Sequence, residues 1–130
     1  MQVLVTGATG YVGSRLVPAL LSAGFDVVAT ARDQDRLLRM GWAGQVQSRC
    51  LDVLASASVR AALETCGPVD VAYYLVHALG EGDYESSDER AAEIFATEAA
   101  AAGVGRIVYL GGFVPTGATL SAHLRSRARV

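Results

Sequence analysis

Charged residues, cysteines and long apolar runs are all scarce in this sequence. Charged side chains make up 18% of the 130 residues, and 11 basic against 13 acidic residues leave a formal net charge of −2. Because the chain has no basic block, nucleic acid is not an expected partner. No apolar run approaches the roughly 18 residues that a membrane span needs, and no basic flank marks a targeting segment at the N-terminus. These absences predict a cytoplasmic protein without a membrane span.

The two cysteines are Cys50 and Cys66. They have neither the spacing of metal ligands nor a histidine partner nearby, so no metal site is expected. We expect two reduced, mostly buried thiols without a redox role. Hydrophobic residues, in contrast, form 52% of the chain, which is typical of a parallel sheet covered by helices on both faces.

The most informative stretch is the N-terminal one, from Met1 to Gly13. A short apolar run, Val3 to Val5, is broken by a glycine-rich segment, and an apolar pattern of helical spacing follows. The stretch therefore predicts a strand, a glycine turn and a helix. In such a turn three spaced glycines allow a tight exit from the strand, close approach of a pyrophosphate, and contact between helix and strand.

The N-terminus of the helix after this turn would present N–H groups and partial positive charge to a phosphate. The alternative, a turn that binds nothing, leaves the glycine spacing without a packing purpose. We therefore predict that the turn binds a dinucleotide. The expected contact residues are Gly7, Thr9, Gly10, Tyr11, Val12 and Gly13.

Strand and helix patterns alternate along the rest of the chain. Ser86 and Glu89 have capping-box spacing, so Ser86 is expected to be the N-cap of an alanine-rich helix. Five strands with four helices and part of a fifth predict an α/β fold: a doubly wound parallel sheet of the Rossmann type, with strand order 3-2-1-4-5. The expected strands are 3–5, 25–31, 46–51, 69–76 and 106–110, and the expected helices are 14–23, 34–40, 56–66, 87–102 and 120–130.

The end of the second strand predicts which dinucleotide is preferred. In a dinucleotide-binding fold this point meets the adenosine ribose, where an acidic residue would bind a free 2′-hydroxyl. Here the tip carries Arg32, with Thr30 before it and Arg36 one turn further on. A guanidinium group binds phosphate oxygens through paired charge-assisted hydrogen bonds. NADP(H) is therefore predicted in preference to NAD(H). Asp33 moderates this preference, and the alternative is that both arginines are solvated surface charges.

Two further strand ends contribute to the predicted site. Asp52 can accept a hydrogen bond from the adenine amino group while Val53 packs on the ring, although Asp52 could equally cap the helix that follows. Val76, His77 and Ala78 are expected to line the ribose and diphosphate at the end of the fourth strand. His77 is also a candidate acid or base, but a wall residue that forms hydrogen bonds is the plainer interpretation.

Four segments together resemble the short-chain dehydrogenase/reductase superfamily, in particular its atypical NmrA-like and nucleoside-diphosphate-sugar epimerase-like members. They are Thr6 to Gly13, the Asp52-Val53 pair, Tyr74 to Gly80, and Tyr109 to Gly112. The resemblance implies a cofactor site at the glycines, a basic NADP-selecting residue at Arg32, and adenine contacts from Asp52 and Val53. It also implies oxidoreductase or epimerase chemistry.

The catalytic residues of that superfamily do not carry over. Its active members use a serine after the fifth strand, then a tyrosine followed four residues later by a lysine. Gly111 stands at the serine position, the segment from His123 to Arg127 takes the tyrosine-to-lysine stretch, and no tyrosine follows Tyr109. Arg127 stays protonated and is no base. His123 is a candidate proton carrier, and a solvated surface helix is the alternative; the catalytic residues are thus left open.

Two functional classes follow from these observations. The first is an NAD(P)(H)-binding domain, residues 1–130, of an oxidoreductase or epimerase-like protein whose substrate region is absent from the chain. The second is a non-catalytic regulator that senses NADP(H), or an assembly scaffold. Because the sheet is expected to be incomplete at its C-terminal side, a homo-oligomer or a protein partner is also expected.

Overall fold

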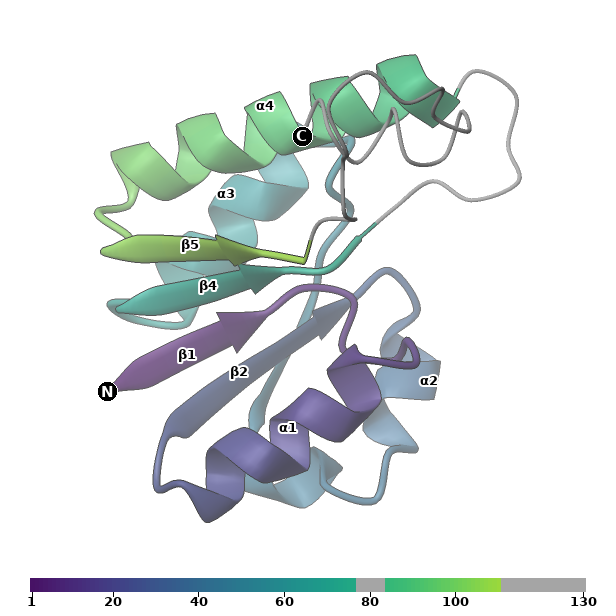
Figure 1. Ribbon diagram of the computed structural model, residues 1–130, viewed down its shortest axis with the longest axis vertical. Helices are drawn as coiled ribbons and strands as arrows, with labels where there is room; N and C mark the ends of the chain where they lie inside the picture. The colour runs from purple at the N-terminus through teal and green to yellow at the C-terminus, as the bar shows by residue number, and fades with distance from the viewer. Residues whose placement is uncertain (77–83, 111–130) are drawn as a thin grey trace, which may run out of the picture.

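One parallel sheet forms the centre of the protein (Figure 1). The computed structural model describes residues 1–76 and 84–110. Within these residues five strands pair in the order β3-β2-β1-β4-β5. They are β1 (Gln2–Val5), β2 (Asp26–Ala31), β3 (Gln47–Cys50), β4 (Val71–Tyr74) and β5 (Arg106–Tyr109). The predicted α/β class and strand order are confirmed.

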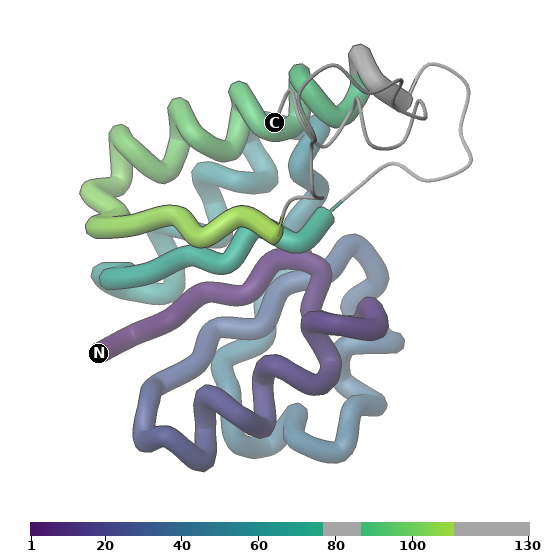
Figure 2. The backbone as a smooth tube through the Cα atoms, in the orientation of Figure 1, coloured from purple at the N-terminus to yellow at the C-terminus, as the bar shows by residue number. Residues whose placement is uncertain are grey.

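Helices cover both faces of the sheet. Figures 1 and 2 show α1 and α2 on one side and α3 and α4 on the other, as right-handed crossovers from β1 in opposite directions require. The helices are α1 (Gly13–Ser22), α2 (Gln34–Leu38), α3 (Ser56–Thr65) and α4 (Tyr84–Ala101), with a short 3₁₀ turn at Ala43–Gln45.

The sheet separates two hydrophobic cores. Leu4 and Val28 pack toward α3 and α4 with Phe95, whereas Val3 and Val5 pack toward α1. Each of these side chains is almost completely buried. Since neighbouring side chains of a strand point to opposite faces, the part of a strand that lies between two helical layers must be apolar at every position, as β1 is from Val3 to Val5.

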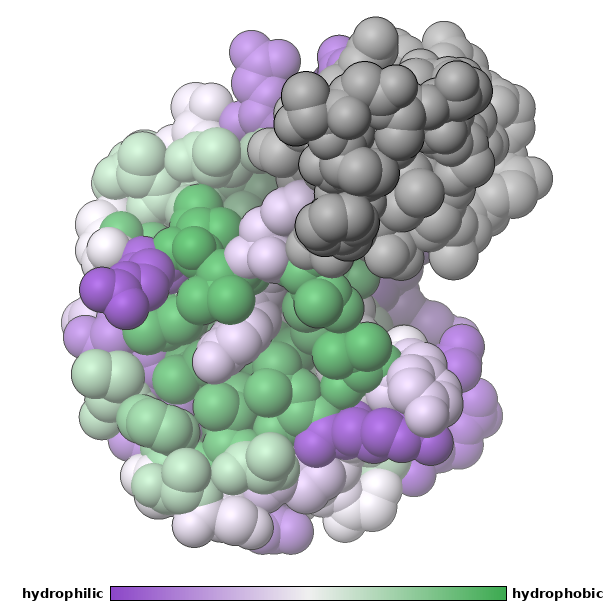
Figure 3. Space-filling view, viewed as in Figure 1, coloured by the Kyte–Doolittle hydropathy of each residue, from purple (hydrophilic) through white to green (hydrophobic). Residues whose placement is uncertain are grey.

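The edge of the sheet at β5 is more open. Figure 3 shows apolar side chains gathered over β5 and β4 in this view. Ile107 and Leu110 are 41% and 45% exposed. Among the residues that the structure describes, the apolar side chains at this edge are therefore only partly buried.

Three local predictions were wrong. Helix α4 begins at Tyr84, so Ser86 lies inside the helix and is not its N-cap. The alanine-rich segment is a good helix former, so the helix extends beyond the capping-box pattern. Cys66 is buried as expected, but Cys50 is exposed at the end of the edge strand β3. Strand β4 is also shorter than the predicted 69–76.

Candidate functional site

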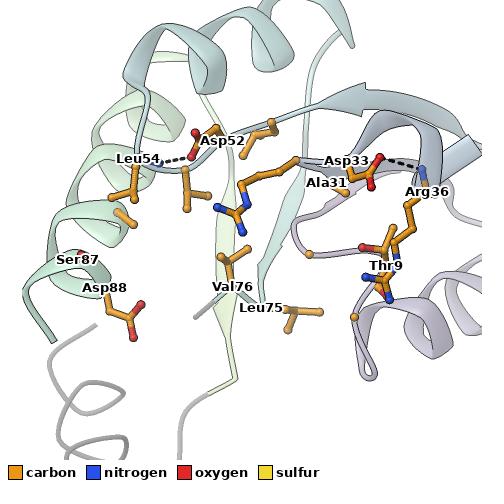
Figure 4. Close-up of a pocket in the computed structure, with 16 residues that line it drawn as sticks. Thr9, Ala31, Asp33, Arg36, Asp52, Leu54, Leu75, Val76, Ser87 and Asp88 are labelled. Atoms are coloured by element: carbon orange, nitrogen blue, oxygen red, sulfur yellow. Dashed lines mark hydrogen bonds between the residues drawn. The ribbon is translucent and has the colours of Figure 1, made fainter. Parts of the chain in front are cut away.

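A cavity of about 440 Å³ opens at the carboxyl ends of the first four strands (Figure 4). Its walls come from the glycine turn after β1, the segments after β2, β3 and β4, and the N-terminal part of α4. The lining residues are Gly7, Thr9, Gly10, Ala31, Arg32, Asp33, Arg36, Leu51, Asp52, Val53, Leu54, Leu75, Val76, Ser87, Asp88 and Ala91.

The glycine turn is built as its spacing predicts. Gly7 has a φ of +66°, which side chains disfavour. At Gly13 an added Cβ would lie 2.2 Å from the Gly7 carbonyl oxygen, so α1 can approach the turn only with glycine there. No side chain caps this end of α1, whose N-cap is Val12. The helix N-terminus is thus left to interact with an anion.

The expected contact residues of the turn fall into two groups. Gly7, Thr9 and Gly10 line the cavity. Tyr11, Val12 and Gly13 are not among the lining residues. The side chains of Tyr11 and Val12 are 77% and 42% exposed, and the Arg15 guanidinium carbon lies 3.8 Å from the centroid of the Tyr11 ring.

Both predicted arginines reach the cavity. Arg32 and Arg36 line it, and the Arg36 guanidinium donates to the Thr9 carbonyl oxygen at 3.4 Å. Asp33 also lines it, but its Oδ1 accepts the main-chain N–H of Arg36 at 3.1 Å and caps α2.

Thr30 does not take part with these arginines. It is completely buried, its hydroxyl donates to the Val5 carbonyl oxygen at 3.0 Å, and it is not a lining residue. The expected support from Thr30 was wrong, because its side chain is buried within the sheet and its hydroxyl is already bonded to the main chain of β1.

Asp52 orders the turn before α3 and does not cap that helix. Its Oδ1 accepts the Leu54 N–H at 3.0 Å, and its own N–H donates to the Ser58 hydroxyl at 2.9 Å. The N-cap of α3 is Ala55, without a side-chain bond. The alternative that Asp52 caps the following helix was therefore wrong, and Asp52 and Val53 both line the cavity.

The ends of β1 and β4 are tied together by Thr6, which is completely buried. The Thr6 hydroxyl donates to the Tyr73 carbonyl oxygen at 2.9 Å and accepts the Leu75 N–H at 3.0 Å. This fixes Leu75 and Val76 against the glycine turn, where both line the cavity. His77, Ala78 and His123 lie outside the described residues.

Residues 7–123 match the model of a protein family described as NAD(P)H-binding. The chain belongs to this NAD(P)H-binding family. A cinnamoyl-CoA reductase of Oryza sativa subsp. japonica is 44% identical over 70 residues, which are 49% of this chain and 21% of the reductase. The chain spans between 21% and 26% of the length of the curated relatives that it matches.

Solved structures share the fold of this NAD(P)H-binding chain. A short-chain type dehydrogenase/reductase from Mycobacterium marinum has a TM-score of 0.77 at 20% identity and covers 98% of this chain with 64% of its own length. A nucleoside-diphosphate-sugar epimerase from Staphylococcus aureus has a TM-score of 0.70 at 21% identity, over 85% of this chain and 38% of its own. The predicted resemblance to both groups is confirmed for the fold. No helix in the described ranges is long and apolar enough to cross a membrane.

The wall of the cavity that α4 supplies was not predicted from the sequence. Ser87 and Ala91 lie one helical turn apart on that wall, and Asp88 beside them is 4% exposed. Burial raises the pKa of the nearby Tyr74 phenol far above its ordinary value, and the negative charge of Asp88 raises it further. The spacing of Ser87 and Ala91 places them on one helix face, but sequence alone does not say which face meets the cavity.

Proposed function

We propose that this chain, as one dinucleotide-binding domain, binds NADP(H) in the cavity at the strand ends. The observation that carries the proposal is the placement of Arg32 and Arg36 together in the cavity wall, next to the glycine turn. A 2′-phosphate carries up to two negative charges, and paired guanidinium groups are suited to bind it. In a cavity open to water, a free ribose hydroxyl would have no comparable need of two cations.

The rest of the cavity accounts for the other parts of the cofactor. The diphosphate lies against Gly7, Thr9 and Gly10, and main-chain groups from Tyr11 to Gly13 together with the α1 N-terminus stabilise its charge. Adenine packs on Val53 beside Asp52. The ribose on the nicotinamide side lies near Val76, with His77 and Ala78 assigned from the sequence.

Asp33 does not oppose this assignment. Its carboxylate already accepts the main-chain N–H of Arg36, so its role is to begin α2. The capping bond also fixes the start of the helix that carries Arg36. An acid that would otherwise select a ribose diol thereby helps to position a phosphate-binding arginine.

The proposed reaction is oxidoreduction or epimerase-like chemistry of a small carbonyl or hydroxyl compound. The bound nicotinamide supplies hydride transfer, and the residues of this chain bind and orient it. The name of the cinnamoyl-CoA reductase relative supports a reductive direction. His77 and His123 are the proposed candidates for moving a proton.

A second candidate is a non-catalytic regulator that senses NADP(H), or an assembly scaffold. Gly111 at the serine position favours it, as does the lack of any tyrosine after Tyr109. Tight binding of cofactor without turnover of carbonyl compounds, together with capture of a protein partner, would select this candidate.

Calorimetric titration with NADP⁺ and NAD⁺ tests the cofactor assignment. Wild type is expected to bind NADP⁺ more tightly, and Arg32→Ala is expected to lose at least about tenfold in that preference, the size of one charge-assisted hydrogen bond. Arg39→Ala is the matched control, since Arg39 ends α2 and does not line the cavity. Equal affinities of wild type for NADP⁺ and NAD⁺ would contradict the preference.

A further inference from the structure

Arg36 is bonded to two different parts of the cavity wall. Its guanidinium donates to the Thr9 carbonyl oxygen at 3.4 Å, and its main-chain N–H donates to the Asp33 carboxylate at 3.1 Å. All three residues line the cavity. Figure 4 shows the Arg36 side chain running from α2 toward Thr9. Arg36 therefore connects the start of α2 to the glycine turn that follows β1.

The bond to Thr9 restrains a peptide unit within the glycine turn. The Thr9 carbonyl and the Gly10 N–H belong to one planar peptide group. The Gly10 N–H donates to the Gly7 carbonyl oxygen at 3.1 Å, so this peptide group is bonded at both of its ends. Because glycine adopts a wide range of φ values, the Arg36 bond restricts an orientation that the residue at position 10 does not itself fix.

Arg32 is not connected to the turn in this way. It lines the same cavity, but in the part of the chain that the structure describes its guanidinium forms no hydrogen bond or ion pair. The two arginines therefore differ, although they bring the same charge to the same wall. Removal of Arg32 takes away a charge alone, whereas removal of Arg36 takes away a charge and a restraint on the glycine turn.

The orientation of the turn matters to every dinucleotide, because NAD(H) and NADP(H) share the diphosphate. Main-chain groups that are already oriented bind a ligand at a lower entropic cost than groups that must first be ordered. We propose that Arg36 is a positioning residue that holds the glycine turn, through the Thr9 carbonyl, in the orientation that binds the diphosphate. This inference rests on the proposed function, because it gives an arginine of the same site a second role. Arg32 then sets the preference for NADP(H), and Arg36 adds affinity for both dinucleotides.

Calorimetric titration of the whole chain with NAD⁺, which has no 2′-phosphate, separates the two roles. Arg36→Ala is expected to weaken NAD⁺ binding by about three- to tenfold, the size of one hydrogen bond. Arg32→Ala removes the same charge from the same wall and is expected to weaken NAD⁺ binding by less than about twofold, since charges open to water are largely screened. Arg39→Ala, at the end of α2 and outside the cavity wall, is expected to keep the wild-type affinity.

Hydrogen exchange of the ligand-free chain, followed by NMR, measures the restraint itself. The Gly10 amide is expected to exchange about three- to tenfold faster in Arg36→Ala than in wild type, because its peptide group is then bonded at one end only. Arg39→Ala is the control here as well, and its Gly10 amide is expected to exchange at the wild-type rate.

Three results would overturn the inference, and they are distinguishable. If Arg36→Ala and Arg32→Ala bind NAD⁺ equally well while wild type still prefers NADP⁺, Arg36 is a ligand of the 2′-phosphate alone and the proposed function stands. An unchanged exchange rate of the Gly10 amide in Arg36→Ala would lead to the same conclusion. If wild type binds neither dinucleotide, the cofactor assignment fails together with this inference. Should Arg36→Ala fail to fold, as judged by circular dichroism, Arg36→Met removes the same guanidinium, keeps a good helix former and is held to the same comparisons.

Discussion

At the scale of single residues, Gly13 lies so close to the main chain of Gly7 and Ala8 that it has no space for a side chain. An added Cβ would lie 2.2 Å from the Gly7 carbonyl oxygen and 2.9 Å from the Ala8 Cα. Both neighbours are main chain, so neither can rotate away. We expect Gly13→Ala to cost about 1–3 kcal/mol in the free energy of unfolding, as overpacking does, and to displace the glycine turn.

Urea denaturation measures this cost, and Gly41→Ala is its control. Gly41 has no positive φ, and an added Cβ there meets nothing within 4 Å. Alanine at this position is expected to be neutral or slightly stabilising, because it restricts the unfolded chain. If the two variants are equally stable, the close approach of α1 to the turn is not what requires glycine at position 13.

The indole N–H of Trp42 replaces a main-chain hydrogen-bond donor that α1 lacks. Pro18 lies inside α1 and has no N–H, so the Ser14 carbonyl one turn earlier lacks its helical partner. The indole Nε1 of Trp42, a buried side chain, donates to that carbonyl oxygen at 3.2 Å. Trp42→Phe is expected to cost about 1–2 kcal/mol by leaving the carbonyl unpaired and a smaller ring in the core.

A double-mutant cycle with Pro18→Ala isolates this bond. Alanine restores an N–H for the Ser14 carbonyl, so Trp42→Phe should cost less in the Pro18→Ala background. Chemical denaturation of the four proteins gives the coupling. Strictly additive effects would show that the indole bond contributes nothing beyond packing.

The roles of glycines, which act through the main chain, were predictable from the sequence. The placement of other side chains was only partly predictable. Gly7 and Gly13 follow from spacing, because a tight turn and a close helix contact admit little else. The side chain of Thr30 was misplaced because it is buried and its hydroxyl donates to the Val5 carbonyl oxygen inside the sheet. Asp88 was missed because burial of a helical acid depends on what the helix packs against, and local sequence carries no such information.

At the scale of elements, α3 and α4 are joined by a charged pair as well as by apolar contacts. The Arg60 guanidinium donates to both Glu98 carboxylate oxygens, at 2.9 and 3.1 Å. These hydrogen bonds, and then the positive charge, hold the pKa of Glu98 below its ordinary value. A carboxyl group whose pKa is lower in the folded than in the unfolded protein stabilises the fold at pH values above its unfolded pKa. This stabilisation is lost as the pH falls through the pKa of the folded protein.

The expected outcome is a stability difference that depends on pH. Glu98→Gln should lower Tm relative to wild type at pH 7, and the difference should shrink as the pH falls below the pKa of Glu98 in the folded protein. Thermal melts at several pH values measure it, with Glu93→Gln as a charge-matched control on the exposed side of α4. A difference that stays constant from neutral to acid pH would argue against the ion pair as its source.

Element type and order followed from the sequence more reliably than element ends. Continuous apolar runs bounded by glycine identified the strands, and alternation with helices then left the doubly wound order as the natural topology. The start of helix α4 was predicted three residues too late, because a capping-box pattern inside a good helix-forming segment need not be used as a cap. Helix capping was one of the two alternatives for Asp52, and turn geometry decided against it, because the carboxylate accepts the Leu54 N–H.

At the scale of the whole molecule, the cavity connects parts that share few other contacts. Its walls include the turn after β1, the start of α2, the turn before α3 and the N-terminal part of α4. These segments belong to opposite helical layers, with separate hydrophobic cores on the two faces of the sheet. A ligand that spans the cavity must therefore stabilise the two layers together.

Binding of NADP⁺ is consequently expected to raise the stability of the entire chain. A ligand at one hundred times its Kd adds about 2.7 kcal/mol to the free energy of unfolding, which for a chain of this size raises Tm by roughly 6–15 °C. The shift should grow with the logarithm of NADP⁺ concentration and should be much smaller in Arg32→Ala at the same concentration. Hydrogen exchange should slow in both layers, near β2 and in α4 alike, because the bound state opens only when the ligand leaves. Protection confined to the glycine turn and α2 would instead mean that the nucleotide does not reach α4, and adenine would then have to lie elsewhere in the cavity.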